Sequence, residues 1–172
     1  SFSRLNLNLN VNGHDSAVYD LNGDGRSDIY TTGGRVSFGN ANNTFTTYAV
    51  TGNNYGGSAS SVALADFMGN GGSSIILTDQ AAWKSGNNRL YSWAINNGFF
   101  EISLINNLPD SRFLLPKWSS YGFDGSHDYR SLAFDFDNSG LTSAVIFSRP
   151  VKSDGNGGWT WPNYSEIQFL KN

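Results

Sequence analysis

Acidic and amide side chains recur at a regular spacing between residues 20 and 28, in the segment Asp-Leu-Asn-Gly-Asp-Gly-Arg-Ser-Asp. Oxygen-bearing side chains stand at positions 1, 3, 5 and 9 of this segment, called loop one, and a glycine stands at position 6. A hard cation such as Ca²⁺ takes roughly six to eight oxygen ligands, and the glycine lets the chain turn back around the ion. Loop one therefore predicts a calcium site formed by the side chains of Asp20, Asn22, Asp24 and Asp28 and by the backbone carbonyl of Arg26.

Two other interpretations of loop one are open. An EF-hand would require a bidentate glutamate at position 12 and flanking helices, whereas Thr31 stands at that position and the flanks have the pattern of strands. A polar turn that closes a hairpin without an ion would use the same residue types. We favour calcium because three carboxylates held close together repel one another in the absence of a cation.

Two further segments follow the plan of loop one, in which an apolar run, an aspartate and a glycine-containing loop lead into a second apolar run. Loop two, residues 66–74, begins with Asp66 but has Met68 and Ser74 at positions 3 and 9. Because a thioether is a poor ligand for Ca²⁺, we expect a plain turn there. Loop three, residues 135–143, carries fewer charges and should bind calcium more weakly. Its candidate ligands are Asp135, Asp137, Ser139 and Ser143.

The segments around these loops alternate apolar and polar residues, which predicts strands with one buried face, and none shows a convincing helical period. A first strand is expected at 3–12, followed by three repeat units. Unit one, about 13–52, has predicted strands at 16–20, 27–32, 35–39 and 44–50; unit two, about 58–107, has them at 61–66, 73–79, 89–96 and 99–106; unit three, about 130–172, has them at 131–136, 142–148 and 164–170.

Loop one and its two decayed copies resemble the FG-GAP/VCBS-type repeats of β-propellers, as in integrin α-subunit heads, secreted bacterial proteins and some fungal lectins. With the strands that the loops join, the resemblance covers most of the chain. It implies an all-β fold in which each repeat is one four-stranded blade and the metal loop joins the innermost strand to the second. The alternative fold is a β-trefoil, because twelve strands in three units would also suit it.

The whole chain, 1–172, is expected to be a single propeller-type domain. A propeller closes its ring with about 4–8 blades, so three blades imply a partial ring. Unit three lacks an outermost strand, and strand 3–12 would complete such a blade. A homodimer or a partner chain would then close the ring; alternatively, the chain is a fragment of a longer propeller.

In a propeller the loops alternate between two faces, and most tryptophans of this chain fall in loops opposite the metal loops. Aromatic rings beside polar residues are platforms for sugars, whose C–H faces stack on the ring. The alternative is that these rings fold down to cover the ends of the blades. The candidate ligand-binding residues are Trp83, Trp118, Tyr121, His127, Trp159 and Trp161.

The composition excludes several classes of function. The 11 basic residues are scattered in a chain of net charge −3, which argues against nucleic acid as a partner. No cysteine is present, so disulfides and thiolate metal sites are excluded, and no apolar run approaches the roughly 20 residues of a membrane helix. With only His14 and His127 and no evident pair of facing carboxylates, no catalysis is expected.

The sequence therefore predicts a secreted, extracellular binding module that calcium stabilises. Its expected partner is a carbohydrate or cell-surface glycoconjugate, held as in a lectin or an adhesion protein. The alternative is a protein-interaction or scaffold segment of a larger toxin, adhesin or secreted enzyme.

Overall fold

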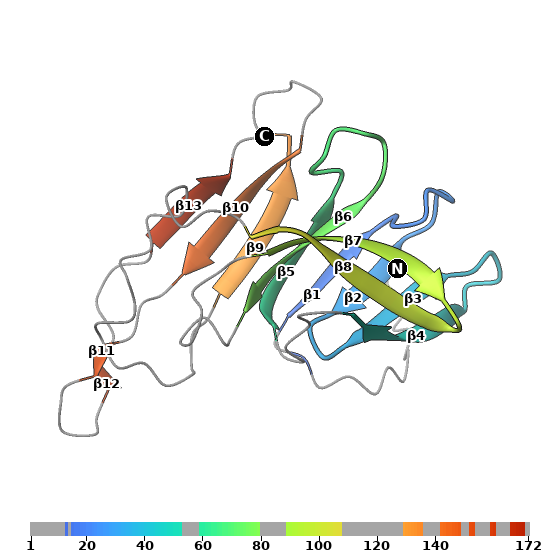
Figure 1. Ribbon diagram of the computed structural model, residues 1–172, viewed down its shortest axis with the longest axis horizontal. Helices are drawn as coiled ribbons and strands as arrows, with labels where there is room; N and C mark the ends of the chain where they lie inside the picture. The colour runs from blue at the N-terminus through green and yellow to red at the C-terminus, as the bar shows by residue number, and fades with distance from the viewer. Residues whose placement is uncertain are drawn as a thin grey trace, which may run out of the picture.

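A computed structural model of the chain describes residues 13, 15–52, 59–79, 89–107, 129–135, 142–148, 152–153, 159–160 and 166–170. In these ranges all regular secondary structure is β-strand, which confirms the expected all-β class (Figure 1). Among the residues described, none forms a helix with the length and apolar character needed to cross a bilayer.

Unit one is an antiparallel meander, in which each strand pairs with the next along the chain. Its strands are β1 (Ser16–Tyr19), β2 (Asp28–Thr31), β3 (Arg35–Gly39) and β4 (Phe45–Thr51). Unit two repeats this arrangement with β5 (Ala59–Ala65), β6 (Ser74–Asp79), β7 (Arg89–Asn96) and β8 (Phe99–Asn107). The strands predicted in both units are confirmed, with bounds that differ by only a residue or two.

A short parallel seam joins the two meanders into one sheet. Val50 in β4 pairs with Phe100 in β8, and Thr51 pairs with Glu101. Within the described residues this gives an eight-stranded sheet in the order β1-β2-β3-β4-β8-β7-β6-β5. Its two end strands lie next to each other, and the amide of Val62 in β5 donates a hydrogen bond to Asp15, just before β1 (3.2 Å). The sheet is therefore nearly closed and barrel-like, and its division into propeller blades remains a proposal.

Two apolar clusters flank strands β5 and β6. Val62 and Leu64 point into the first cluster, which fills the interior between the two meanders, while Ala63 and Ala65 point into the second. The two-residue period of a strand explains this division. Because both faces are covered, the segment 61–65 is a continuous run of buried residues.

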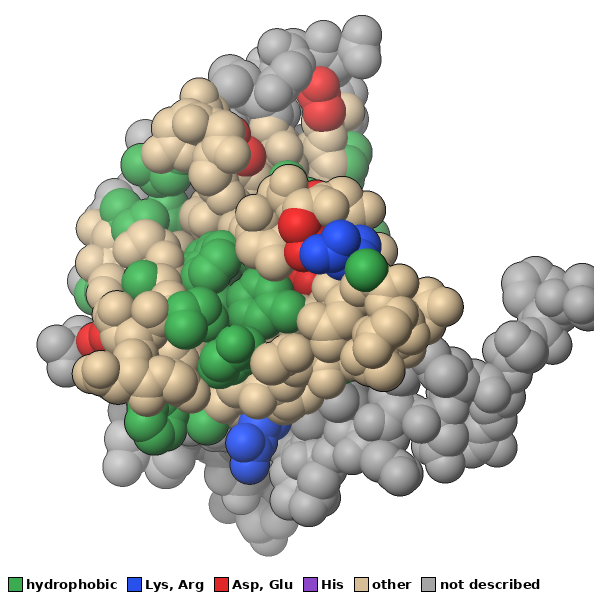
Figure 2. Space-filling view, turned by 90° about the vertical axis from the view of Figure 1, so that its right-hand side faces the viewer, with side chains coloured by type: hydrophobic (Ala, Val, Ile, Leu, Met, Phe, Trp, Pro, Cys, Tyr) green, Lys and Arg blue, Asp and Glu red, His purple; other side chains and the backbone are tan. Residues whose placement is uncertain are grey.

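The first cluster also reaches the surface. Half-buried side chains pack against it, namely Ala17, Tyr19, Tyr48, Trp93 and Leu104. Figure 2 shows apolar side chains gathered in the middle of one face, with polar side chains and backbone around them.

Unit three packs on the other side of β5. Its described strands β9 (Tyr129–Phe134), β10 (Ser143–Ser148) and β13 (Glu166–Leu170) form an antiparallel sheet with β10 in the centre. Ala144 belongs to the second cluster and Ala133 packs against it, and β9 lies beside β5 (Figure 1). The three strands were predicted within two residues, but the short hairpin of β11 (Lys152–Ser153) and β12 (Trp159–Thr160) was not. The predicted strand at 3–12 lies outside the described residues.

Candidate functional site

The first residue of loop one, Asp20, accepts hydrogen bonds from backbone amides of the same loop. The two carboxylate oxygens of Asp20 accept hydrogen bonds from the amides of Asp24 (3.0 Å) and Gly25 (2.8 Å). Gly23 and Gly25 have φ angles of 74° and 80°, in the region that favours glycine. Gly25, the glycine at position 6, therefore turns the chain back toward the first aspartate.

The last aspartate of loop one fastens it to the sheet. Asp28 begins β2 and is completely buried. One of its carboxylate oxygens accepts from the amide of Leu21 (2.8 Å) and the other accepts from the amide of Gly39 at the end of β3 (2.9 Å). The carboxylate thus joins the start of the loop to the third strand.

An arginine supplies positive charge to the middle of loop one. The Arg26 guanidinium pairs with the Asp24 carboxylate (2.5 Å) and also donates to the carbonyl of Gly39 (2.8 Å). The side-chain amide of Asn22 donates to the same Asp24 oxygen (2.9 Å). The sequence assigned only a backbone carbonyl to Arg26, and its side-chain role was missed.

Loop two has the same hydrogen-bonded frame as loop one. The Asp66 carboxylate accepts hydrogen bonds from the amides of Asn70 (3.2 Å) and Gly71 (2.7 Å), which lie four and five residues after it. The amides that Asp20 accepts lie at the same spacing in loop one. Gly69 and Gly71 have φ angles of 65° and 80°, which match those of loop one. Ser74 replaces Asp28, and its hydroxyl accepts from the amide of Phe67 (3.2 Å). The repeat seen in the sequence is thus a repeat in backbone geometry.

The hydrogen-bonded frame of loop two predicts that this loop contributes to the dependence of stability on acidic pH. The amide of Gly71 is the largest cause that lowers the pKa of Asp66 below its ordinary value of 3.8; burial opposes the shift and the amide of Asn70 adds to it. A carboxylate with a lowered pKa stabilises the fold above its ordinary pKa, and the benefit is lost as pH falls through the lowered value. We expect wild-type stability to decline below about pH 4, and Asp66→Asn to flatten that decline.

Urea unfolding at intervals from about pH 5 to about pH 3 measures this dependence. Parallel loss of stability in the wild type and in Asp66→Asn would show that this carboxylate contributes nothing to it.

The donor types of loop one suit a hard cation, but their placement here is organised by hydrogen bonds. Among the described residues, no group of three or more acidic, histidine or cysteine side chains is arranged to hold a metal ion. Asp24 is paired with Arg26, and both oxygens of Asp28 face amides. Ca²⁺ would therefore have to replace the guanidinium at Asp24.

The other predicted site residues are not brought together in the described part of the chain. In loop three, Asp135 is exposed and Ser143 is buried at the start of β10, while Asp137 and Ser139 lie outside the described residues. The predicted ligand face also lies outside them: of Trp159 only the backbone is described, as part of β12. The other residues predicted for that face lie outside the described residues; they are Trp83, Trp118, Tyr121, His127 and Trp161.

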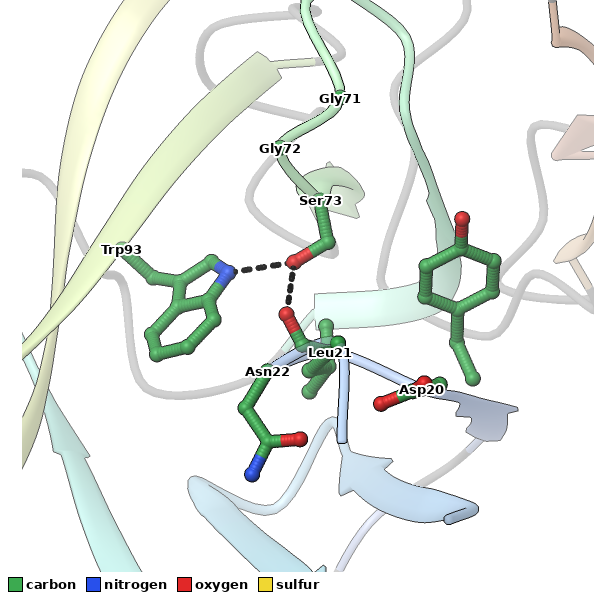
Figure 3. A pocket seen from close by; sticks show the side chains of 9 residues that line it. Asp20, Leu21, Asn22, Gly71, Gly72, Ser73 and Trp93 are labelled. Atoms are coloured by element: carbon green, nitrogen blue, oxygen red, sulfur yellow. Dashed lines mark hydrogen bonds between the residues drawn. The ribbon is translucent and has the colours of Figure 1, made fainter. Parts of the chain in front are cut away.

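A cavity of about 590 Å³ opens between loop one and loop two. Figure 3 shows the chain of hydrogen bonds at its edge: the Trp93 indole N–H donates to the Ser73 hydroxyl (2.8 Å), which donates to the carbonyl of Leu21 (2.6 Å). These bonds connect β7 and both loops. Trp93 lies in the predicted strand 89–96 and was not among the predicted site residues, because no local pattern shows which loop a strand residue will face.

No protein-family model matches this chain, and a search of curated proteins finds no match.

Proposed function

We propose that this chain is a calcium-stabilised module of FG-GAP/VCBS-type repeats that binds carbohydrate. The observation that carries the proposal is the pair of matching aspartate-headed loops, each placed between the first and second strands of a four-stranded meander. In the FG-GAP/VCBS-type repeats that the sequence resembles, the metal loop joins the innermost strand of each blade to the second strand, and both loops here join the first strand of a meander to its second.

Loop one is the better calcium site of the two. Asp20, Asn22 and Asp24 offer side-chain oxygens, and Arg26 offers a carbonyl. Bound calcium would supply the positive charge that Arg26 now places on Asp24. Asn70 takes the place of Asp24 in loop two, and Met68 takes the place of Asn22, so loop two has fewer oxygens and less charge.

Calcium should raise the melting temperature of the wild-type chain relative to excess chelator. A ligand present at about 100 times its Kd adds roughly 2.7 kcal/mol to the free energy of unfolding, which corresponds to about 5–10 °C for a chain of this length. Asp24→Asn should shrink the shift, whereas Arg26→Gln should enlarge it, because the competing guanidinium is gone. Differential scanning calorimetry with Ca²⁺ and with chelator measures both.

Identical melting curves for the wild type with calcium and with chelator would refute the calcium proposal. An Arg26→Gln variant that responds to calcium no more than the wild type would refute the competition at Asp24 alone.

The carbohydrate part of the proposal rests on aromatic side chains beside polar loops. Trp93 borders the cavity between the two loops, and tryptophans are frequent in the loops that the sequence assigns to the opposite face. A ring stacks on the C–H face of a sugar, while amides and carboxylates accept its hydroxyls. Binding to a broad glycan array tests this proposal.

Exposed apolar side chains favour a second candidate, a scaffold that docks a protein. Leu132 and Phe134 on β9 are 55% and 41% exposed, and they alternate with Ala133, which faces the second cluster. Leu132 and Phe134 therefore point to the face of β9 opposite the second cluster. A silent glycan array together with a particle mass above that of the monomer would favour this candidate.

A further inference from the structure

The cavity between loop one and loop two has an aromatic side and a polar side. Trp93 of β7 and Tyr19 at the end of β1 provide the rings, and Asp20 and Asn22 provide polar side chains. Its volume of about 590 Å³ falls within the range of small-molecule sites, roughly 300–1,000 Å³. Figure 3 shows Trp93 on one side of the space, with Asn22 and Asp20 across from it on loop one.

The Trp93 ring is fixed before any ligand arrives. It stacks on Phe100 with ring centroids 5.0 Å apart and planes inclined by 16°, and Phe38 packs nearby with a centroid distance of 5.8 Å. Its N–H is already used in the bond to Ser73. A ligand therefore meets the ring as an apolar, pre-organised surface, which reduces the entropy lost on binding.

The polar side of the cavity offers acceptors rather than positive charge. Each carboxylate oxygen of Asp20 accepts one backbone amide and retains capacity for another hydrogen bond. Among the described residues that line the cavity, Asp20 carries the only formal charge, so an anionic ligand is disfavoured. Gly23 and Gly71 lack side chains where a Cβ would meet no atom within 4 Å, so a ligand has room to approach the backbone.

An apolar ring opposite hydrogen-bond acceptors matches a neutral ligand with a C–H face and several hydroxyl donors. We infer that the cavity between loops one and two is a saccharide-binding site, with Trp93 as the stacking surface and Asp20 and Asn22 as hydroxyl acceptors. This inference rests on the proposed carbohydrate-binding function and places the site between loops one and two, whereas the sequence predicted it in the tryptophan-rich loops.

Fluorine NMR of the full chain labelled with 5-fluorotryptophan tests the assignment. The probes are glucose, galactose, mannose, fucose and N-acetylglucosamine as methyl glycosides, with tetramethylammonium and inorganic phosphate as charged probes. The Trp93 signal is identified by its absence in Trp93→Phe, a variant that keeps an aromatic ring against Phe100. We expect at least one glycoside to shift the Trp93 signal.

Asn22 is also a calcium ligand in the proposed function, so affinity for that glycoside is measured by titration calorimetry in excess chelator, where loss of calcium cannot explain a change. Two variants should weaken binding there by about three- to tenfold. Trp93→Phe reduces the stacking surface, and Asn22→Ala removes one acceptor. Asn42→Ala is the matched control, because Asn42 is an exposed asparagine that hydrogen-bonds within another polar turn, to Thr44 (2.6 Å). Its affinity for the glycoside should equal that of the wild type.

The remaining outcomes separate the site from the function. Glycosides that shift other tryptophan signals while Trp93 stays unchanged would overturn this site and leave the carbohydrate function standing. A Trp93 signal that responds only to tetramethylammonium or phosphate would overturn the ligand class. No response to any glycoside, together with a silent glycan array, would overturn both the function and the site.

Discussion

Replacement of Asp28 by alanine should lower the free energy of unfolding by about 2–5 kcal/mol. The Asp28 carboxylate is fully buried and accepts the amides of Leu21 and Gly39. Without it, two buried N–H groups lose their acceptor, at a cost of roughly 1–3 kcal/mol each. Loop one and the end of β3 would also lose their common anchor. Urea unfolding of the wild type and the variant measures the difference.

Ser74→Ala is the matched control, because Ser74 holds the same position in loop two. Its hydroxyl accepts one amide, that of Phe67 (3.2 Å), and donates to the carbonyl of Ala65 (3.1 Å). Because only one buried N–H loses its acceptor and no buried carboxylate is removed, we expect a smaller loss than for Asp28→Ala. Equal midpoints for Asp28→Ala and the wild type would contradict the anchoring role. The unfolding of the wild type and of both variants should also be measured in excess chelator. If Asp28→Ala no longer lowers the free energy of unfolding there, Asp28 acts through a bound cation and not through the two amides.

Local patterns were sufficient to predict the strands of units one and two and the frame of loops one and two. Alternation in unit one places the predicted strands within a residue of those observed, and the two-residue connection at Asn97-Gly98 separates β7 from β8 as expected. The aspartate and glycine spacing also predicted that loops one and two share a plan. These features depend on residues close together in the chain, whose side-chain periods and backbone preferences are visible in the sequence.

Features that join distant segments could not be predicted in this way. The Trp93–Ser73–Leu21 chain of hydrogen bonds depends on how unit two lies against unit one, and no residue pattern records that placement. The side-chain pairing of Arg26 with Asp24 was missed for a different reason. The spacing of the oxygen ligands predicts a bound cation in loop one. It does not indicate that the guanidinium of Arg26 pairs with Asp24 instead.

The parallel seam between β4 and β8 is another such feature, and Gly52 lies directly after its last paired residue in β4. Gly52 follows β4 with a φ angle of 144°, and a Cβ placed there would lie 2.0 Å from the carbonyl oxygen of Ile102 in β8. Backbone atoms of a paired strand cannot rotate away as a flexible side chain could. Gly52→Ala should therefore cost more than about 3 kcal/mol and separate β4 from β8. Urea unfolding and the hydrogen-exchange rates of the seam amides measure both effects.

Gly98→Ala separates steric overlap from backbone strain. Gly98 also has a positive φ angle, 79°, but a Cβ there would meet no atom within 4 Å. That variant should lose only about 1–2 kcal/mol, because strain alone opposes it. If Gly52→Ala is no less stable than Gly98→Ala and the seam amides exchange at the wild-type rate, β4 and β8 do not approach as closely as the structure has them. A large loss confined to Gly52→Ala, with faster exchange along β4 and β8, would show that the close approach at this glycine helps to join the two meanders into one sheet.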